Sequence, residues 1–287
     1  GASSVYGESA DVIILATLDD AVSGQRTVPA SGGGWSFSAL RNINYYLENS
    51  DNCKDEAVRK KYDGLAKFFR AYFYFDKVKQ FGDVPWYNRV LGSNDPDLYK
   101  ARDPRALVMD SVLQDIDYAI ANLPAQKNVY RVNKWTALAL KSRIGLFEGT
   151  FRKYHGIDGY EKFLDASIEA SHILITQGGY DLHTAGSTPY QDLFASMNAN
   201  PNEIILARDY DANLSLMHSV QYYQNTSSMG KPGLSKNIVN TYLMNDGSRF
   251  TDKPGYEAMQ FFDECKNRDP RLAQTIRTPG YTRKGSS

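Results

Sequence analysis

Between Ala39 and Thr176, apolar residues recur at three- and four-residue spacing in one segment after another, and this periodicity limits the fold more than any other feature. The clearest segment follows Asp103 and Pro104, because Asp is a favoured N-cap residue and Pro is tolerated in the first turn. Its apolar side chains repeat along one face until Pro124, where we expect the helix to end. These apolar positions are Val108, Met109, Val112, Leu113, Ile116, Ala119, Ile120 and Leu123.

The same part of the sequence predicts further helices. They are expected over Leu40–Leu47, Ala57–Phe81, a segment that Asn133 caps, and Tyr160–Thr176. Small residues such as Ser142 and Gly145 lie in the segment after Asn133, so a neighbouring helix can approach it closely. Long helices joined by short connections, without strands between them, indicate antiparallel pairs stacked as a bundle or an α-solenoid. They argue against a parallel α/β sheet.

After Gly178 the composition changes, because Gly, Pro, Asn, Ser and Tyr become frequent and the helical periodicity fades. We predict a short strand over residues 203–207 and short helices within residues 234–244 and 256–266. The sequence thus divides into a helical region, residues 1–177, and a loop-rich region, residues 178–287, packed on it as a single structural unit. Loops held by a rigid scaffold are where binding sites usually lie.

The segment KFFRAYFYFDKVKQFGDVPW is dense in aromatic rings and basic side chains. At 100° per residue, one half of this helix carries Leu65, Phe68, Phe69, Tyr72, Phe73 and Phe75, and the other half carries Lys67, Arg70, Tyr74 and Lys77. Full burial stabilises each large ring by roughly 1.5–3 kcal/mol, so we expect the first group to form core rather than a ligand platform. Asp76 falls within that apolar half, and we expect it to pair with Arg143 of a neighbouring helix.

Blocks of sequence spread over nearly the whole chain resemble the SusD/RagB family of outer-membrane nutrient-binding lipoproteins. They are, in order, FFRAYFYFDKVKQFGDVPW, DPDLYKARDPRALVMDSVLQDIDYAIANLP, NKWTALALKSRIGLFEGTFRKYHG and FDECKNRDPRLAQTIRTPGY. The resemblance implies tetratricopeptide-like helix pairs that support an irregular ligand-binding half. It also implies that the protein captures oligosaccharides or polysaccharides as the extracellular lid of a SusC-like TonB-dependent transporter.

The resemblance further implies a place at the extracellular face of the cell outer membrane, through a lipid anchor in the full-length protein. The lipidated Cys of the family and part of its C-terminal region are absent from this chain, so we expect it to be truncated at both ends. The RagB branch of the family implies an alternative, in which the protein binds a peptide and serves as a module that docks the transporter.

Composition argues against other classes of partner. Lys and Arg total 33, as do Asp and Glu, and this zero net charge does not favour nucleic acid. The longest apolar runs are far shorter than a membrane span. The four His are scattered without metal-ligand spacing, and the segment from Asp209 lacks the Gly and Glu of a calcium-binding EF-hand loop. Two Cys exclude a disulfide framework, although Cys53 and Cys265 could form one bridge.

Catalytic motifs are likewise missing from the sequence. It contains no GxSxG elbow, P-loop or GxGxxG, and no motif selects two carboxylates as a glycosidase pair. We therefore expect a non-enzymatic protein without cofactors or metals.

Two loops have the composition of a sugar-binding site, with rings for stacking and polar groups for hydrogen bonds. In SGQRTVPASGGGW, Trp35 is a candidate stacking platform with Gln25 and Arg26 at its edge. Alternatively, Trp35 is the hydrophobic anchor of the helix that follows.

The second loop is HSVQYYQNTSSMGKPG, where Tyr222 and Tyr223 lie near Asn225. Neighbouring residues of an extended segment point to opposite sides, so we expect at most one of the two Tyr rings to face a ligand.

Overall fold

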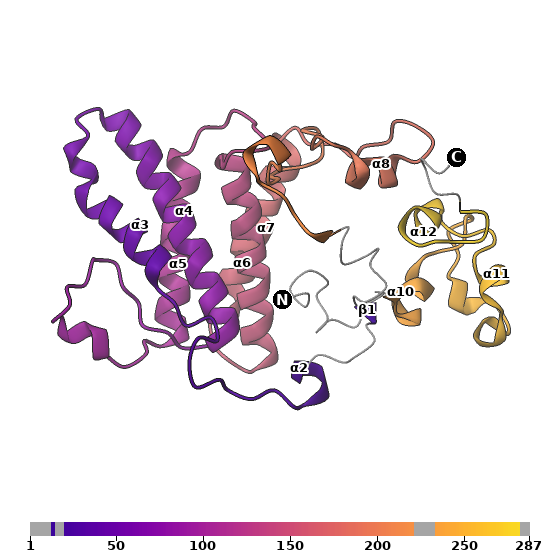
Figure 1. The fold of residues 1–287 in the computed structure, drawn as a ribbon, viewed down its shortest axis with the longest axis horizontal. Coiled ribbons are helices and arrows are strands. Elements are labelled where there is room, and N and C mark those ends of the chain that lie inside the picture. Colours follow the sequence, from indigo (N-terminus) through magenta and orange to yellow (C-terminus); the bar gives the residue numbers. More distant parts are fainter. Residues whose placement is uncertain (1–12, 15–19, 221–232, 282–287) are drawn as a thin grey trace. The chain divides into compact units, whose positions relative to one another are not determined.

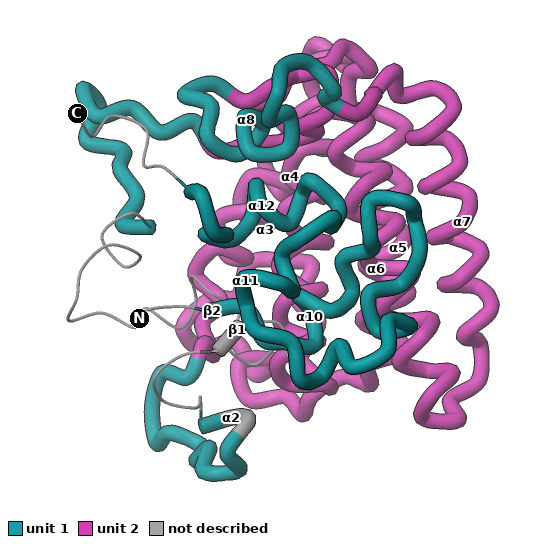
Figure 2. The backbone as a smooth tube through the Cα atoms, turned by 90° about the vertical axis from the view of Figure 1, so that its right-hand side faces the viewer, with its two compact units in different colours: residues 1–33, 183–198, 209–287 teal, residues 34–182, 199–208 magenta. Residues whose placement is uncertain are grey.

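The computed structural model describes residues 13–14, 20–220 and 233–281, and the chain forms two compact units (Figures 1 and 2). Unit 1 comprises residues 1–33, 183–198 and 209–287, and unit 2 comprises residues 34–182 and 199–208. The predicted boundary between residues 177 and 178 stays a prediction.

Unit 2 contains the long helices, and the mainly α, tetratricopeptide-like fold expected from the sequence is confirmed. The helices are α3 (Ser38–Asn49), α4 (Glu56–Phe81), α5 (Arg105–Asn122), α6 (Lys134–Tyr154) and α7 (Tyr160–Gln177), with short 3-10 turns η1 (Ser50–Asn52) and η2 (Pro96–Tyr99). The most extensive contacts join α4 to α5 and α6 to α7, and smaller contacts join α3 to α4 and α5 to α6 (Figure 1). Each helix therefore packs on its sequence neighbours, as in an α-solenoid.

The cap of α6 agrees with the sequence, whereas α5 begins where the sequence predicts but is capped by a different residue. Asn133 accepts hydrogen bonds from the backbone N–H groups of Trp135 and Thr136 in a capping box. Asp103 was expected to cap α5, yet its carboxylate accepts the backbone N–H of Trp86 at 2.7 Å. Asp83 caps α5 instead, because its Oδ1 accepts the backbone N–H of Arg105 at 2.8 Å.

Small residues bring α6 and α7 into close contact, as the sequence predicts. The Ser142 and Ser171 hydroxyls lie 2.7 Å apart across the two helices, and the Ser167 hydroxyl donates to the Ser142 carbonyl at 2.8 Å. A Cβ atom at Gly145 would lie 2.5 Å from the carbonyl oxygen of Phe163, so the approach requires glycine there.

Helix α4 buries a different face from the one predicted. Phe68 and Phe75 are buried as expected, but Tyr74 is fully buried while Phe69 and Tyr72 are 44% and 48% exposed. The buried face is turned toward Arg70, whose charge was expected to keep it at the surface. Arg70 can lie inside because Asp115 of α5 neutralises it.

The predicted pair between Asp76 and Arg143 is wrong. Asp76 lies on the exposed side of α4 and pairs with Lys79 at 2.6 Å, one turn further along the same helix. The rotation of the buried face away from Tyr72 carries Asp76 into solvent, so its carboxylate needs no partner from another helix.

Unit 1 contains short elements, namely β1 (Ile13–Ile14), α2 (Asp20–Ser23), α8 (Pro189–Ala195), η3 (Ala212–Leu214), β2 (Gly233–Leu234), α10 (Lys236–Thr241), η4 (Phe250–Asp252), η5 (Tyr256–Ala258), α11 (Phe261–Glu264) and α12 (Pro270–Thr275). β1 and β2 pair antiparallel. The helices predicted within residues 234–244 and 256–266 form as α10, η5 and α11.

The strand predicted over residues 203–207 does not form. The backbone N–H of Ile204 bonds to the Asn200 carbonyl in a turn, and the N–H of Ala207 bonds to the Val129 carbonyl. A turn at Asn200 and one long-range bond to Val129 thus take the place of a strand ladder.

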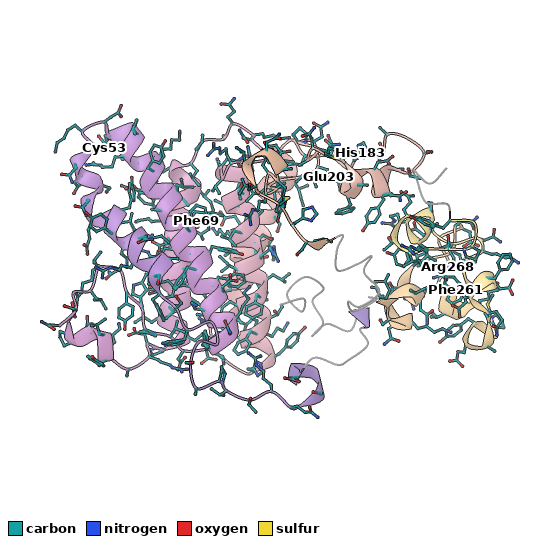
Figure 3. All side chains as sticks on the ribbon, viewed as in Figure 1. Cys53, Phe69, His183, Glu203, Phe261 and Arg268 are labelled. Carbon is teal, nitrogen blue, oxygen red and sulfur yellow. The ribbon has the colours of Figure 1, made fainter. Side chains whose placement is uncertain are left out.

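Arg268, from the fourth family-like block, holds the C-terminal elements of unit 1 together (Figure 3). Its Nη1 donates to the Glu264 carbonyl at 2.9 Å, and its Nη2 donates to the carbonyls of Val239 and Tyr242 at 2.7 and 2.8 Å. The guanidinium also lies 3.9 Å from the centre of the Phe250 ring. One buried side chain therefore fixes the end of α10 against α11 and η4.

Cys53 and Cys265 are both free thiols. Within the described ranges, no helix combines the length and the apolar character that a bilayer crossing demands.

A candidate ligand-binding cavity

A cavity of about 610 Å³ lies in unit 2, between the start of α3 and the segment from Pro85 to Arg102. This volume is in the range of small-molecule sites, which run from about 300 to 1,000 Å³. The side chains that line it include rings, cations and amides or hydroxyls. They are Trp35, Phe37, Tyr87 and Tyr99, then Arg41, Arg89, Lys100 and Arg102, then Ser38 and Asn44.

Trp35 lines this cavity and also packs on neighbouring rings. Its ring makes edge contacts with Phe37 and Phe81, with centroids 5.2 and 4.9 Å apart. The Arg102 guanidinium lies 4.9 Å from the Trp35 ring, and the side chain remains 41% exposed. The two interpretations of the sequence are thus compatible, since Trp35 anchors the chain before α3 and offers ring surface to the cavity.

The structure does not place the other predicted site residues relative to Trp35. Gln25 and Arg26 are exposed residues of unit 1, whereas Trp35 belongs to unit 2, so their place at its edge stays a prediction. Tyr222, Tyr223 and Asn225 lie outside the described residues, and their part in a site also stays a prediction.

The wall of the cavity is held from behind by Tyr74 of α4. Its hydroxyl accepts the backbone N–H of Tyr87 at 2.6 Å and donates to the Pro85 carbonyl at 3.2 Å. Burial raises the pKa of the Tyr74 hydroxyl, so the group stays protonated and can donate at every ordinary pH. Asn44 of α3 donates to the carbonyls of Tyr87 and Arg89, at 2.9 and 3.1 Å.

A buried ion pair fixes Asn44 in turn. Arg70 donates from Nε and Nη2 to the two oxygens of Asp115, at 2.6 and 2.8 Å, and from Nη1 to the Asn44 Oδ1 at 3.2 Å. Both charged side chains are less than a tenth exposed. The chain of bonds therefore runs from α5 through α4 and α3 to the backbone of the cavity wall, and it positions that wall rather than contacting ligand.

The backbone of Trp86 is clamped from the other side by Asp103 and Lys100. Lys100 donates to the Trp86 carbonyl at 2.8 Å and pairs with Asp103 at 2.7 Å. Burial alone would raise the pKa of Asp103, but the hydrogen bonds from Lys100 and from the Trp86 N–H lower it below its ordinary value. The carboxylate is therefore ionised at neutral pH, as the clamp requires.

The segment from Tyr87 to Asp97 closes on itself. The Tyr87 hydroxyl donates to the Asp97 carbonyl at 2.9 Å. Arg89 donates from Nη2 to Asp95 and Asp97, at 2.9 and 2.8 Å, and this guanidinium lowers the pKa of Asp95. The loop therefore presents a fixed surface to the cavity.

Tyr99 is a candidate site residue that the sequence reasoning missed. It lines the cavity and is 90% exposed, which is unusual for a ring of this size. The criterion that selected Trp35, an isolated ring within a polar, turn-rich segment, also describes Tyr99 in GSNDPDLYKARD. Arg41 carried no such signal, because a basic residue on a helix face is usually only solvated.

The lining is rich in rings and cations and also offers an amide and a hydroxyl. Among the described residues that form it, none is Asp or Glu, the usual acid and base of glycoside hydrolysis. The described part of the chain also holds no cluster of three or more His, Cys, Asp or Glu that could bind a metal ion.

Sequence comparison relates most of the chain to one group of proteins. Residues 35–146 match a family described as "Starch-binding associating with outer membrane", and residues 201–287 match a family described as "SusD family". A SusD-like protein of Bacteroides ovatus is 26% identical over 201 residues, which is 68% of this chain and 34% of the relative. A SusD-like protein of Formosa agariphila is 25% identical over 187 residues, which is 61% of this chain and 31% of the relative. The chain thus spans about a third of the length of these curated relatives.

Solved structures share the fold. A SusD-like protein from Bacteroides fragilis superposes with a TM-score of 0.62 at 23% identity, over 82% of this chain and 46% of that one. A protein crystallised with a xylogluco-oligosaccharide superposes with a TM-score of 0.64 at 20% identity, over 84% of this chain and 50% of that one. A SusD-like carbohydrate-binding protein from B. fragilis gives a TM-score of 0.62 at 20% identity, over 82% of this chain and 44% of that one.

Proposed function

Because the chain belongs to the SusD/RagB family, we propose that it is a non-catalytic protein that binds oligosaccharides or polysaccharides. The observation that supports this most is the cavity of unit 2, where Trp35, Tyr87 and Tyr99 line one space. A pyranose ring has apolar C–H faces that pack on aromatic rings, and a rim of hydroxyls that bond to polar groups. The cavity offers both kinds of surface.

The two exposed rings have different roles in this proposal. Tyr99 is the more accessible platform, since it is 90% exposed on a segment tied down by Arg89 and Lys100. Trp35 offers less surface but is fixed by its contacts with Phe37 and Phe81, so little conformational entropy is lost when a sugar packs on it.

We also propose that the protein works at the extracellular face of the outer membrane and passes its ligand to a SusC-like TonB-dependent transporter. The family description, which names association with the outer membrane, supports the location. The transporter is inferred from the resemblance to the SusD/RagB family. Co-purification with a co-expressed SusC-like transporter tests this part separately, and separation of the two proteins on a sizing column would count against it.

Calorimetry and affinity electrophoresis against a panel of polysaccharides, with oligopeptides beside them, test the binding function. We expect at least one polysaccharide to bind, Trp35→Ala to weaken that binding, and the number of reducing ends to stay constant over time. Binding of peptides alone would favour the RagB-like alternative. A steady rise in reducing ends would show hydrolysis and refute the non-catalytic assignment.

A further inference from the structure

The charged side chains that line the cavity all have one sign. Arg41, Arg89, Lys100 and Arg102 line it, and no Asp or Glu does so within the described residues. Resting on the glycan-binding function proposed above, we infer that the cavity selects acidic glycans, whose sugars carry carboxylate or sulfate groups.

Two of these cations are already neutralised. Arg89 donates to both Asp95 and Asp97, and Lys100 pairs with Asp103 at 2.7 Å. Their carboxylate partners hold them in place, so they contribute shape and hydrogen bonding more than charge.

Arg41 and Arg102 are the lining cations that form no ion pair with a described residue. Each donates only to a backbone carbonyl in the described structure, Arg41 to Leu91 at 2.5 Å and Arg102 to Phe81 at 3.5 Å. Both side chains are exposed, and neither forms an ion pair with a described residue. Each guanidinium therefore keeps N–H groups free for the paired bonds that carboxylates and sulfates accept.

The carboxylates around the cavity are occupied by other donors. Glu48 accepts the backbone N–H of Val90 at 2.6 Å, and Asp95 accepts that of Asp97 at 3.0 Å. Asp103 accepts the Trp86 N–H in addition to Lys100. None of these carboxylates lines the cavity among the described residues, whereas Arg41 and Arg102 do.

The contact between Arg102 and Trp35 places charge next to ring surface. The guanidinium lies 4.9 Å from the ring, as in a cation–π pair. A uronic acid presents a C–H face and a carboxylate on the same sugar, so one residue could pack on the ring and bond to the neighbouring guanidinium. A neutral sugar would replace the water on Arg102 with a weaker, uncharged acceptor.

The experiment is a pairwise titration of the 287-residue chain by calorimetry. Oligogalacturonate is compared with its methyl ester to test carboxylates, and dextran sulfate oligosaccharides are compared with dextran to test sulfates. We expect the acidic member of one pair or both to bind about tenfold tighter or more, with an advantage that shrinks as salt rises. Which pair responds identifies the anionic group.

Single substitutions test whether the cavity cations cause the preference for acidic glycans. Arg41→Gln and Arg102→Gln keep a polar side chain and remove the charge, and each is expected to weaken acidic binding about 5- to 30-fold and to weaken binding of neutral sugar by a smaller factor. Arg131→Gln is the matched control, because Arg131 is an exposed cation of unit 2 that does not line the cavity. The Arg131→Gln variant should bind acidic glycans as tightly as the unsubstituted chain does. Circular dichroism and thermal unfolding confirm that each variant is folded.

Each negative result would exclude a different part of the proposal. Equal binding of acidic and neutral partners would overturn the selection for acidic glycans and leave the glycan-binding function standing. Absence of binding to every glycan would overturn both. If Arg131→Gln lost as much affinity for acidic glycans, the preference would come from general electrostatic attraction and not from the cavity. If poly-glutamate bound as tightly as oligogalacturonate, the site would be assigned to acidic peptides. The ester comparison does not depend on any variant folding.

Discussion

The Tyr74 hydroxyl accepts the backbone N–H of Tyr87 at 2.6 Å, and this bond joins the buried face of α4 to the wall of the cavity. The same hydroxyl donates to the Pro85 carbonyl at 3.2 Å. The ring-rich helix therefore supports the site from behind, and the rings that line the cavity come from the segments around it.

Replacing Tyr74 with Phe should destabilise the protein by about 1–3 kcal/mol, because it leaves the Tyr87 N–H and the Pro85 carbonyl without their partner. Urea unfolding followed by circular dichroism measures the change. Tyr72→Phe is the control, since that residue lies on the same helix but is 48% exposed, and its substitution should stay within about 0.5 kcal/mol. Equal effects of the two substitutions would show that the Tyr74 hydroxyl holds nothing in place.

The ion pair between Arg70 and Asp115 should behave as one unit. Arg70→Met alone, or Asp115→Leu alone, leaves an uncompensated buried charge and should cost about 3–5 kcal/mol. The double variant removes both charges, so its loss should fall well below the sum of the single losses. A double-mutant cycle on unfolding free energies measures this coupling, and additive losses would contradict it.

Much of unit 2 could be predicted from the sequence, because its helices carry their own start and stop signals. The cap at Asn133 and the small residues Ser142 and Gly145 are local features, and the structure confirms both. The rotation of α4 could not be predicted in this way. Apolar periodicity places Arg70 outside, and only the position of Asp115, 45 residues later, allows it inside.

The cavity was harder to predict than the fold. Trp35 was selected because it follows a run of glycines, but Tyr99 and Arg102 reach the same cavity through the path of a long connection between α4 and α5. That path is set by bonds between distant residues, such as Asp103 to the Trp86 N–H. Such bonds cannot be inferred from the spacing of residues in the sequence.

Alanine substitutions at two helical glycines should change stability in opposite directions, because only one of them lies at the close contact between α6 and α7. Gly145→Ala should destabilise by about 1–3 kcal/mol despite the better helix propensity of Ala, because the new Cβ would meet backbone atoms of Phe163 and Ser167 at 2.5 and 2.9 Å. At Gly64 of α4 the nearest atoms lie 3.4 Å away or further, so Gly64→Ala should stabilise by about 0.5–1 kcal/mol. Thermal unfolding of both variants measures the signs, and a stabilised Gly145→Ala would contradict the close approach.

Low pH should weaken the contacts by which Asp103 and Lys100 hold the Trp86 backbone. Because the pKa of Asp103 is lower in the folded chain than in the unfolded one, the unfolded state binds the proton first, and the contribution of Asp103 to stability is complete above about pH 4. It is lost as pH falls from there through the folded-state pKa. Asp103→Asn should therefore lower stability at pH 7 and give a shallower decline between neutral and acid pH. Unfolding free energies measured across this range test the slope, and parallel curves would exclude the linkage.

Substitutions at Tyr99 and Trp35 should both weaken glycan binding but differ in their effect on stability. Tyr99→Ala should weaken the binding of a glycan ligand about 5- to 30-fold and leave the unfolding temperature unchanged, because the side chain is 90% exposed and its loss removes little packing. Trp35→Ala should weaken binding and also lower the unfolding temperature, since it removes the ring contacts with Phe37 and Phe81.

Tyr154→Ala is the matched control for both measurements. Tyr154 is 81% exposed at the end of α6 and does not line the cavity, so its removal should change neither affinity nor stability. If Tyr99→Ala retained full affinity for a glycan that Trp35→Ala no longer bound, the ligand would contact only the Trp35 end of the cavity. If both variants bound like the unsubstituted chain, the glycan would have to bind elsewhere on the protein, and the cavity would lose its assigned role.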